Sequence, residues 1–116
     1  MRVKSELWVR AYLRRCQSEG VPVVISRRGD SDAGAIFICV NQLNGTTLLY
    51  RPVPAGMVGT ETERQWEAAF DAKAVNTEEV DRYLIQAASF DSDVWIIELE
   101  DIAGRHFLGD EFAERA

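Results

Sequence analysis

One histidine and two nearby glutamates are the side chains of this sequence best suited to acid–base chemistry. His106 is the only histidine, and an imidazole with a pKa of about 6.5 exchanges protons at neutral pH. Glu98 and Glu100 precede it by a short turn and can orient its ring. No serine or cysteine close in sequence completes a catalytic triad. His106, Glu98 and Glu100 are therefore candidates for a small enzyme or ligand site, against the alternative of a structural histidine.

Carboxylates around the same segment raise the question of a metal site. Glu98 and Glu100 share one face of an expected strand, about 7 Å apart, and with Asp101 they offer the oxygen ligands that Mg²⁺ or Ca²⁺ takes. The alternative is a solvated strand face whose charges discourage edge-to-edge aggregation. Cys16, Cys39 and the histidine lack the spacing of a zinc site. We therefore assign no metal ligand and expect no cofactor.

Four arginines are candidates for binding an anion or an acidic partner. They are Arg10, Arg14, Arg27 and Arg28. The last two precede Gly29, and cations beside an open backbone are the elements of a small anion site. The alternative is a plain connecting loop with solvated charges.

The charge is uneven along the chain. Residues 1–58 hold eight basic and four acidic side chains, whereas residues 59–116 hold five basic and fifteen acidic ones. Such asymmetry is typical of a binding face for a charged partner, or else it cancels once the halves fold together. Acidic residues at 78, 79 and 81 begin the second expected helix, where a double-stranded RNA-binding domain needs basic ones. We expect at most weak nucleic-acid contact, through the four arginines.

The bulk composition describes a small folded domain. The chain has 116 residues, of which 47% are hydrophobic and 28% charged, and its net charge is -6. No apolar run approaches the roughly 18 residues that cross a bilayer, and no signal peptide is readable. We expect a cytoplasmic location, no membrane span and two reduced, buried cysteines. We expect residues 1–110 to form one domain and residues 111–116 an acidic tail that frays.

Two amphipathic helices are expected. Residues 5–19 carry an apolar stripe at helical spacing, with Ser5 as the N-cap and Gly20 past the end. The second helix follows Asn76, which we expect to cap it, as part of Asn76-Thr77-Glu78-Glu79. The stripe residues are Trp8, Val9, Tyr12, Leu13 and Cys16 in the first helix and Val80, Tyr83, Leu84 and Ala87 in the second.

The remaining segments predict a sheet. Expected strands cover residues 21–27, 35–43, 46–51, 93–101 and 105–108, with a weaker one at 64–70, and residues 52–63 read as a long surface loop. Asn44-Gly45 predicts a two-residue hairpin that places Val40 opposite Leu49 and Cys39 opposite Tyr50. Both faces of this hairpin are apolar, so we expect it inside the sheet with cover on each side.

The resulting order is α-β-β-β-(β)-α-β-β. It predicts an α+β single domain with a mainly antiparallel sheet of five to six strands and two packed helices.

Three segments of the chain carry a family resemblance. They are Lys4-Ser5-Glu6-Leu7-Trp8-Val9-Arg10-Ala11-Tyr12-Leu13-Arg14-Arg15-Cys16, the loop Arg28-Gly29-Asp30-Ser31-Asp32-Ala33-Gly34, and residues 90–101 followed by Gly104-Arg105-His106-Phe107. With these segments the chain resembles the small bacterial family catalogued as domain of unknown function 1491. The resemblance implies a stand-alone bacterial protein and no particular activity. Ser92 departs from the expected pattern, which has proline after Asp91.

Three functions follow from the residues. The first is a non-enzymatic protein-interaction module that binds an unknown protein partner or associates with itself, since no nucleophile–base pair, phosphate loop or metal spacing is readable. The second is a small enzyme, ligand binder or divalent-metal binder that uses His106 with Glu98 or Glu100. The third is weak nucleic-acid contact through the arginines.

Overall fold

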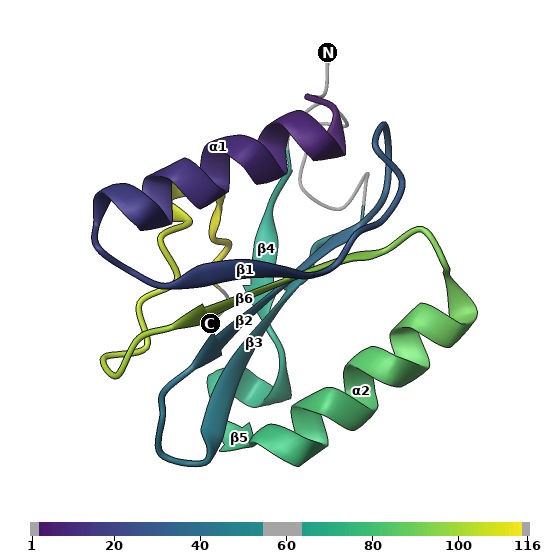
Figure 1. The fold of residues 1–116 in the computed structure, drawn as a ribbon. Helices are drawn as coiled ribbons and strands as arrows, with labels where there is room; N and C mark the ends of the chain where they lie inside the picture. The colour runs from purple at the N-terminus through teal and green to yellow at the C-terminus, as the bar shows by residue number, and fades with distance from the viewer. Residues whose placement is uncertain (1–2, 55–63, 115–116) are drawn as a thin grey trace.

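The computed structural model describes residues 3–54 and 64–114. In these residues a six-stranded mixed sheet lies between two helices, one on each face (Figure 1). The elements in chain order are α1 (Ser5–Ser18), β1 (Val23–Arg27), β2 (Ile36–Asn41), β3 (Thr46–Pro52), β4 (Trp66–Ala68), β5 (Val75–Asn76), α2 (Thr77–Phe90) and β6 (Trp95–Glu100). Short 3-10 turns cover Phe70–Ala72 and Gly109–Glu111. The predicted α+β single domain with two packed helices is confirmed.

The last strand of the sheet is inserted near one edge. The strands lie in the order β1-β6-β2-β3-β4, and β5 pairs with β3. β6 runs antiparallel to β1 and parallel to β2, whereas the other pairs are antiparallel. β1 is therefore one edge of the sheet.

Alternation along the central strands divides the core into two layers. In β6, Trp95, Ile97 and Leu99 are fully buried in the layer beneath α1, while Ile96 packs into the layer above α2. The hairpin of β2 and β3 contributes to both layers and so has cover on each side, as predicted. We call these two sides of the sheet the α1 face and the α2 face.

The two helices begin differently. α2 begins as predicted, because the Asn76 side chain accepts a hydrogen bond of 2.8 Å from the N–H of Glu78. The prediction that Ser5 caps α1 is wrong: Lys4 occupies the N-cap position and makes no side-chain capping bond. Ser5 is instead buried, and its hydroxyl donates to the carbonyl of Gly34 at 2.7 Å.

The predicted hairpin register is off by one residue. Cys39 lies opposite Leu49 and Val40 opposite Leu48, so the connecting loop is longer than two residues. The left-handed positions are Leu43 and Gly45, with φ of 63° and 87°. A one-residue slip moves a side chain to the other face, and Val40 and Leu49 accordingly lie in different core layers.

The middle of the chain contains the weaker predicted strand and a strained turn. β4 confirms a strand within residues 64–70. Phe70, Asp71 and Ala72 then follow one another with φ of 55°, 56° and 63°, a left-handed conformation that costs roughly 1–2 kcal/mol per residue. Of the predicted surface loop, Pro52 belongs to β3, and residues 55–63 lie outside the described part of the chain.

The segment after β6 is irregular where a strand is predicted. The turn from Asp101 forms as expected, because the N–H of Gly104 donates to the carbonyl of Asp101 at 2.9 Å. Residues 105–108 then form no strand, because Phe107 takes a left-handed φ of 58° that interrupts extended backbone. Residues 111–113, predicted to belong to a frayed tail, contact α1 and β4.

Candidate functional site

The predicted grouping of His106 with Glu98 and Glu100 is not formed, because the sheet separates its members. His106 lies on the α1 face, where its ring packs against Tyr50 at 5.1 Å and Phe112 at 4.7 Å between ring centres. Glu98 points to the α2 face, where it lines a groove with residues of α2. Glu100 is exposed at the end of β6. A general base on one face of a sheet cannot be oriented by a carboxylate on the other.

His106 has the contacts of a structural histidine. Its Nδ1 accepts a hydrogen bond of 2.9 Å from the N–H of Leu108, so the proton of the neutral ring is on Nε2. Burial lowers the pKa of His106 below its ordinary value. The neutral ring thus holds the turn that leads to the buried side chain of Leu108.

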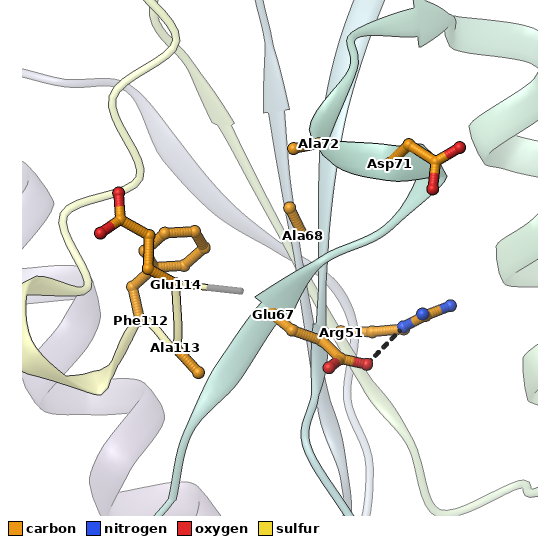
Figure 2. A pocket seen from close by; sticks show the side chains of 8 residues that line it. All are labelled: Arg51, Glu67, Ala68, Asp71, Ala72, Phe112, Ala113 and Glu114. Atoms are coloured by element: carbon orange, nitrogen blue, oxygen red, sulfur yellow. Dashed lines mark hydrogen bonds and ion pairs between the residues drawn. The ribbon is translucent and has the colours of Figure 1, made fainter. Parts of the chain in front are cut away.

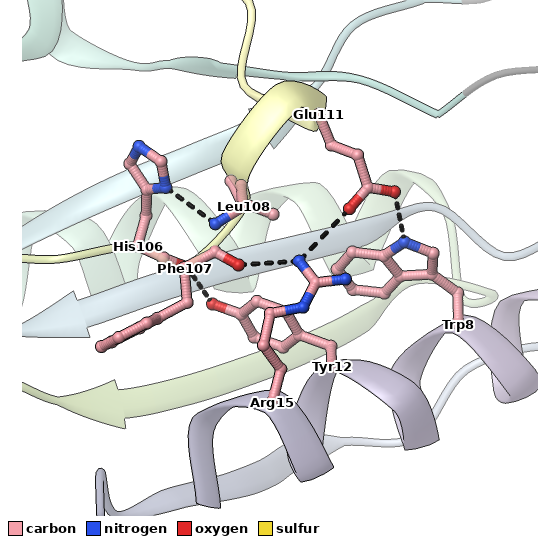
Figure 3. Close-up of polar contacts among 7 residues, drawn as sticks. All are labelled: Trp8, Tyr12, Arg15, His106, Phe107, Leu108 and Glu111. Carbon is pink, nitrogen blue, oxygen red and sulfur yellow. Dashed lines mark hydrogen bonds and ion pairs between the residues drawn. The ribbon is translucent and has the colours of Figure 1, made fainter. Parts of the chain in front are cut away.

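His106 belongs to a set of contacts that fastens the C-terminal segment to α1 (Figure 3). The Tyr12 hydroxyl donates to the carbonyl of His106 at 2.5 Å, and the indole N–H of Trp8 donates to a Glu111 carboxylate oxygen at 2.8 Å. Arg15 adds a hydrogen bond of 2.7 Å to the carbonyl of Phe107. We call residues 105–113 the C-terminal strap, because these contacts bind it across the α1 face.

The acidic residues near β6 are divided between separate partners. Burial raises the pKa of Glu98, and the negative charges of Asp81 and Glu100 raise it further. Asp101 is bound to Arg105, whose Nη2 donates to Oδ1 at 2.8 Å, and this hydrogen bond lowers the pKa of the Asp101 carboxyl. Within residues 3–54 and 64–114, no three His, Cys, Asp or Glu side chains are grouped as metal ligands.

The predicted arginine set is divided as well. Arg28 contacts a Glu6 oxygen at 2.8 Å, and Arg10 lies 3.8 Å from the other oxygen, so one carboxylate meets both guanidinium groups. Arg14 is exposed on α1. Arg27 pairs with Ile96 and therefore lies on the α2 face. The four side chains do not form one anion site.

Both cysteines are buried and free, as predicted. Burial raises the pKa of the Cys16 thiol, and it raises that of Cys39 to about 12. Neither thiol has the thiolate character that a nucleophile needs at neutral pH.

A pocket of about 590 Å³ lies beside β4 and the left-handed turn (Figure 2). Glu67 accepts a hydrogen bond of 2.9 Å from Nε of Arg51, and this pair occupies one wall. The carboxylates of Asp71 and Glu114 point away from one another and from that pair in Figure 2. A ligand site needs polar groups that converge on one position, and these do not.

A groove between α2 and the β1 edge has a more coherent lining. It measures about 350 Å³ and is walled by apolar Leu84, Ile85, Ala88 and Ile96. Four polar residues also line it: Ser26, Arg27, Asp81 and Glu98. It exists because α2 packs over β2 and β3, through contacts with Phe37, Cys39 and Leu49, covers β6 only in part, and leaves the β1 side of this face open.

Large apolar side chains are exposed beside this groove. Ile85 is 71% exposed on α2, and Val24, which lies opposite Glu98 on the same face, is 59% exposed. Arg27 donates from Nη2 to the carbonyl of Ser92 at 3.0 Å, while its buried Nε has no partner among the described residues. We call the groove together with Val24 and the free edge of β1 the open surface.

The open surface is not among the sites predicted from the sequence, although two signals for it exist. Ile85 is apolar but falls outside the buried stripe of α2 that contains Val80 and Leu84. Val23 and Val24 are consecutive apolar residues and so lie on opposite faces of a strand. This pattern indicates either that both faces are buried within the chain or that one face is an exposed contact surface. No local signal shows that β1 is an edge.

No helix in the described residues is long and apolar enough to cross a membrane.

Comparison with known proteins supports the fold and the family. No curated protein matches the chain. A crystal structure of a DUF1491 family protein from Caulobacter crescentus CB15 has a TM-score of 0.79 at 31% sequence identity, covering 98% of this chain and 100% of that one. A solution structure of a protein from A. tumefaciens has a TM-score of 0.76 at 32% identity, covering both chains completely. The model of the family described as protein of unknown function DUF1491 matches residues 3–109, and the chain therefore belongs to that family.

Proposed function

We propose that this protein is a protein-interaction module that docks an apolar, partly basic polypeptide segment on the open surface. The observation that carries the proposal is the half-covered α2 face, where Val24 and Ile85 are exposed on either side of an apolar groove at the edge of the sheet. Edge strands and apolar grooves are the surfaces to which peptide segments add.

The charges around the groove favour a basic segment. Asp81 and Glu98 both line the groove, and their mutual repulsion is one reason that the pKa of Glu98 is raised. A lysine or arginine from a partner would offset that repulsion. Nucleic acid is disfavoured on this face for the same reason, because its phosphates meet carboxylates there.

The enzymatic alternative has less support. His106 is on the opposite face from Glu98, and its ring nitrogen Nδ1 is already engaged by a backbone N–H. A cytoplasmic location and the absence of a cofactor stay predictions.

The test is selection from a random peptide library on the wild-type protein, followed by NMR titration of a selected peptide. We expect enriched peptides to combine apolar and basic residues and to shift the signals of Val24, Ile85 and Ile96. Ile85→Ser should weaken binding about tenfold, because it removes an exposed apolar contact of the kind that is worth about 1–2 kcal/mol in an interface.

The matched control is Phe90→Ser. Phe90 is 84% exposed on the same helix but does not line the groove, so this variant should bind as the wild type does. A library that yields no binder, or binders that shift signals elsewhere, contradicts the proposed function.

A further inference from the structure

We infer that the segment docking on the open surface is β1 of a second copy of this chain, paired antiparallel with β1 across a twofold axis at Val24. This inference rests on the proposed function and names its partner. The product is one continuous sheet through both copies, with both α2 helices on the same face.

The free edge of β1 has backbone groups positioned for this pairing. The N–H of Glu100 donates to the carbonyl of Pro22 at 3.0 Å, and hydrogen-bonded positions in an antiparallel ladder recur at every second residue. Val24 therefore bonds to β6, while the N–H and C=O groups of Val23 and Ile25 face away from the sheet. Pro22 does not obstruct the edge, because its backbone faces β6.

Only one register uses both outward-facing residues. Centring the axis on Val24 places Val23 of each copy opposite Ile25 of the other, so that both pairs exchange backbone hydrogen bonds. The bulge between Ile25 and Arg27 ends the regular ladder and limits pairing to this short segment. The same register places the exposed Val24 side chain directly against Val24 of the second copy, which buries both.

The charges on the α2 face are self-complementary in this arrangement. Glu98 lies beside Val24 in the sheet, and Glu100 lies beside Pro22. In the antiparallel register, Arg27 of each copy lies across the twofold axis from the Pro22 end of β1 in the other copy. The backbone of Arg27 is then about two strand spacings, roughly 10 Å, from β6 of the other copy. An arginine and a glutamate side chain together bridge that distance. Arg27, whose Nη2 donates to the carbonyl of Ser92 within its own copy, would gain an acidic partner for its guanidinium.

Disulfide trapping tests the register directly. In a non-hydrogen-bonded antiparallel pair the Cα atoms are about 4.5 Å apart, within the range that a disulfide spans. The native thiols do not interfere, because Cys16 and Cys39 are 0% and 2% exposed. We expect Val24→Cys to cross-link under mild oxidation about tenfold faster than a matched surface cysteine, because pairing raises the effective concentration of the two thiols.

The matched variant is Leu43→Cys, since Leu43 is 56% exposed against 59% for Val24 and lies in the β2–β3 loop. Native mass spectra of the wild type should show twice the chain mass of 13.1 kDa. Val24→Lys should abolish that species, whereas Leu43→Lys should retain it.

Equal cross-linking of the two cysteine variants, together with a monomeric wild type, overturns the second copy as the partner. That result leaves the proposed function standing if a selected peptide still binds the open surface. The proposed function fails separately, when neither a second copy nor any peptide binds there.

Discussion

The α1 face and the α2 face of the sheet are built from the same strands but are covered to different extents. On the α1 face, the helix and the C-terminal strap close over an aromatic core in which Trp8 and Trp66 lie 4.3 Å apart between ring centres. On the α2 face, one helix covers β2 and β3 and leaves the β1 side open. The difference indicates that the α1 face provides most of the stability, while the α2 face carries the uncovered surface on which we propose that a partner docks.

The largest expected effect comes from removing the centre of the α1 face. Trp66 is 1% exposed, and its indole N–H donates to the carbonyl of Ile36 at 2.7 Å. Trp66→Ala should lower the free energy of unfolding by about 3–5 kcal/mol, through a cavity and an unpaired carbonyl. Leu84→Ala on the α2 face should cost about 2 kcal/mol. Urea denaturation measures both, and a greater loss for Leu84→Ala would reverse the comparison.

A second large effect is expected in the β1–β2 loop, which packs against the start of α1. The N–H of Ser5 donates to the carbonyl of Asp32, and Gly34 lies so close to the chain that a Cβ there would be 2.2 Å from the Asp93 carbonyl oxygen. Gly34→Ala should therefore cost about 3 kcal/mol by overpacking.

Gly20→Ala, in the connection between α1 and β1, is the control for this prediction. Gly20 has a φ of 73°, and a Cβ added there would meet no atom within 4 Å, so only left-handed strain of about 1 kcal/mol applies. Thermal unfolding compares the stabilities of the two variants. Equal losses of stability would show that the β1–β2 loop shifts to accommodate a side chain at position 34.

The two faces should respond to acid in opposite directions. The folded-state pKa of His106, on the α1 face, is lowered by burial, so the unfolded chain binds that proton more readily and stability falls as the pH drops below 6.5. The folded-state pKa of Glu98 is raised above 4.5, chiefly by burial, so the folded chain holds that proton and gains relative stability as the pH falls through the raised value.

Two variants isolate these effects. His106→Asn should reduce the loss of stability between about pH 7 and pH 5.5, where the imidazole of the unfolded chain takes up its proton. Glu98→Gln should raise stability at neutral pH, and its advantage should shrink toward about pH 4, where the wild-type carboxyl is itself protonated. Denaturant titrations across this range provide the measurement, and a Glu98→Gln advantage independent of pH would contradict burial of a charged carboxylate on the α2 face.

The smallest expected effect concerns the open surface. In dilute protein, Val24→Thr and Ile85→Ser should change the free energy of unfolding by no more than about 0.5 kcal/mol, because exposed side chains contribute little to folding. Chemical denaturation at low protein concentration checks this. A loss comparable to that of Leu84→Ala would place these residues in the core and remove the distinction between the two faces.

Local patterns in the sequence predict the helices and most of the strands. The stripe of Trp8, Tyr12 and Cys16 locates α1, and the alternation through Trp95, Ile97 and Leu99 locates β6 with its buried face, because both depend only on periodicity. The cap at Asn76 is equally local.

The predictions that are wrong involve residues that are far apart in the chain or backbone segments with competing conformations. Leu43 takes a left-handed φ in place of Asn44, which lengthens the hairpin loop and shifts its register. Nothing near Glu111 indicates its hydrogen bond to Trp8, because the two residues are far apart in sequence. The insertion of β6 between β1 and β2 is likewise a tertiary result, and it leaves no free edge of β6 with which residues 105–108 could pair. His106 therefore lies on the α1 face, opposite to Glu98.

Amide hydrogen exchange at the edge of β1 tests the central claim most directly. The N–H groups of Val23 and Ile25 face away from the sheet, whereas that of Val24 bonds to β6. We predict that protection of Val23 and Ile25 rises with protein concentration, or on addition of a selected peptide, while the exchange rate of Leu43, whose N–H donates to the Asn41 side chain in the β2–β3 loop, does not change. Exchange of Val23 and Ile25 at unprotected rates under all these conditions would contradict the assignment of this edge as a docking surface.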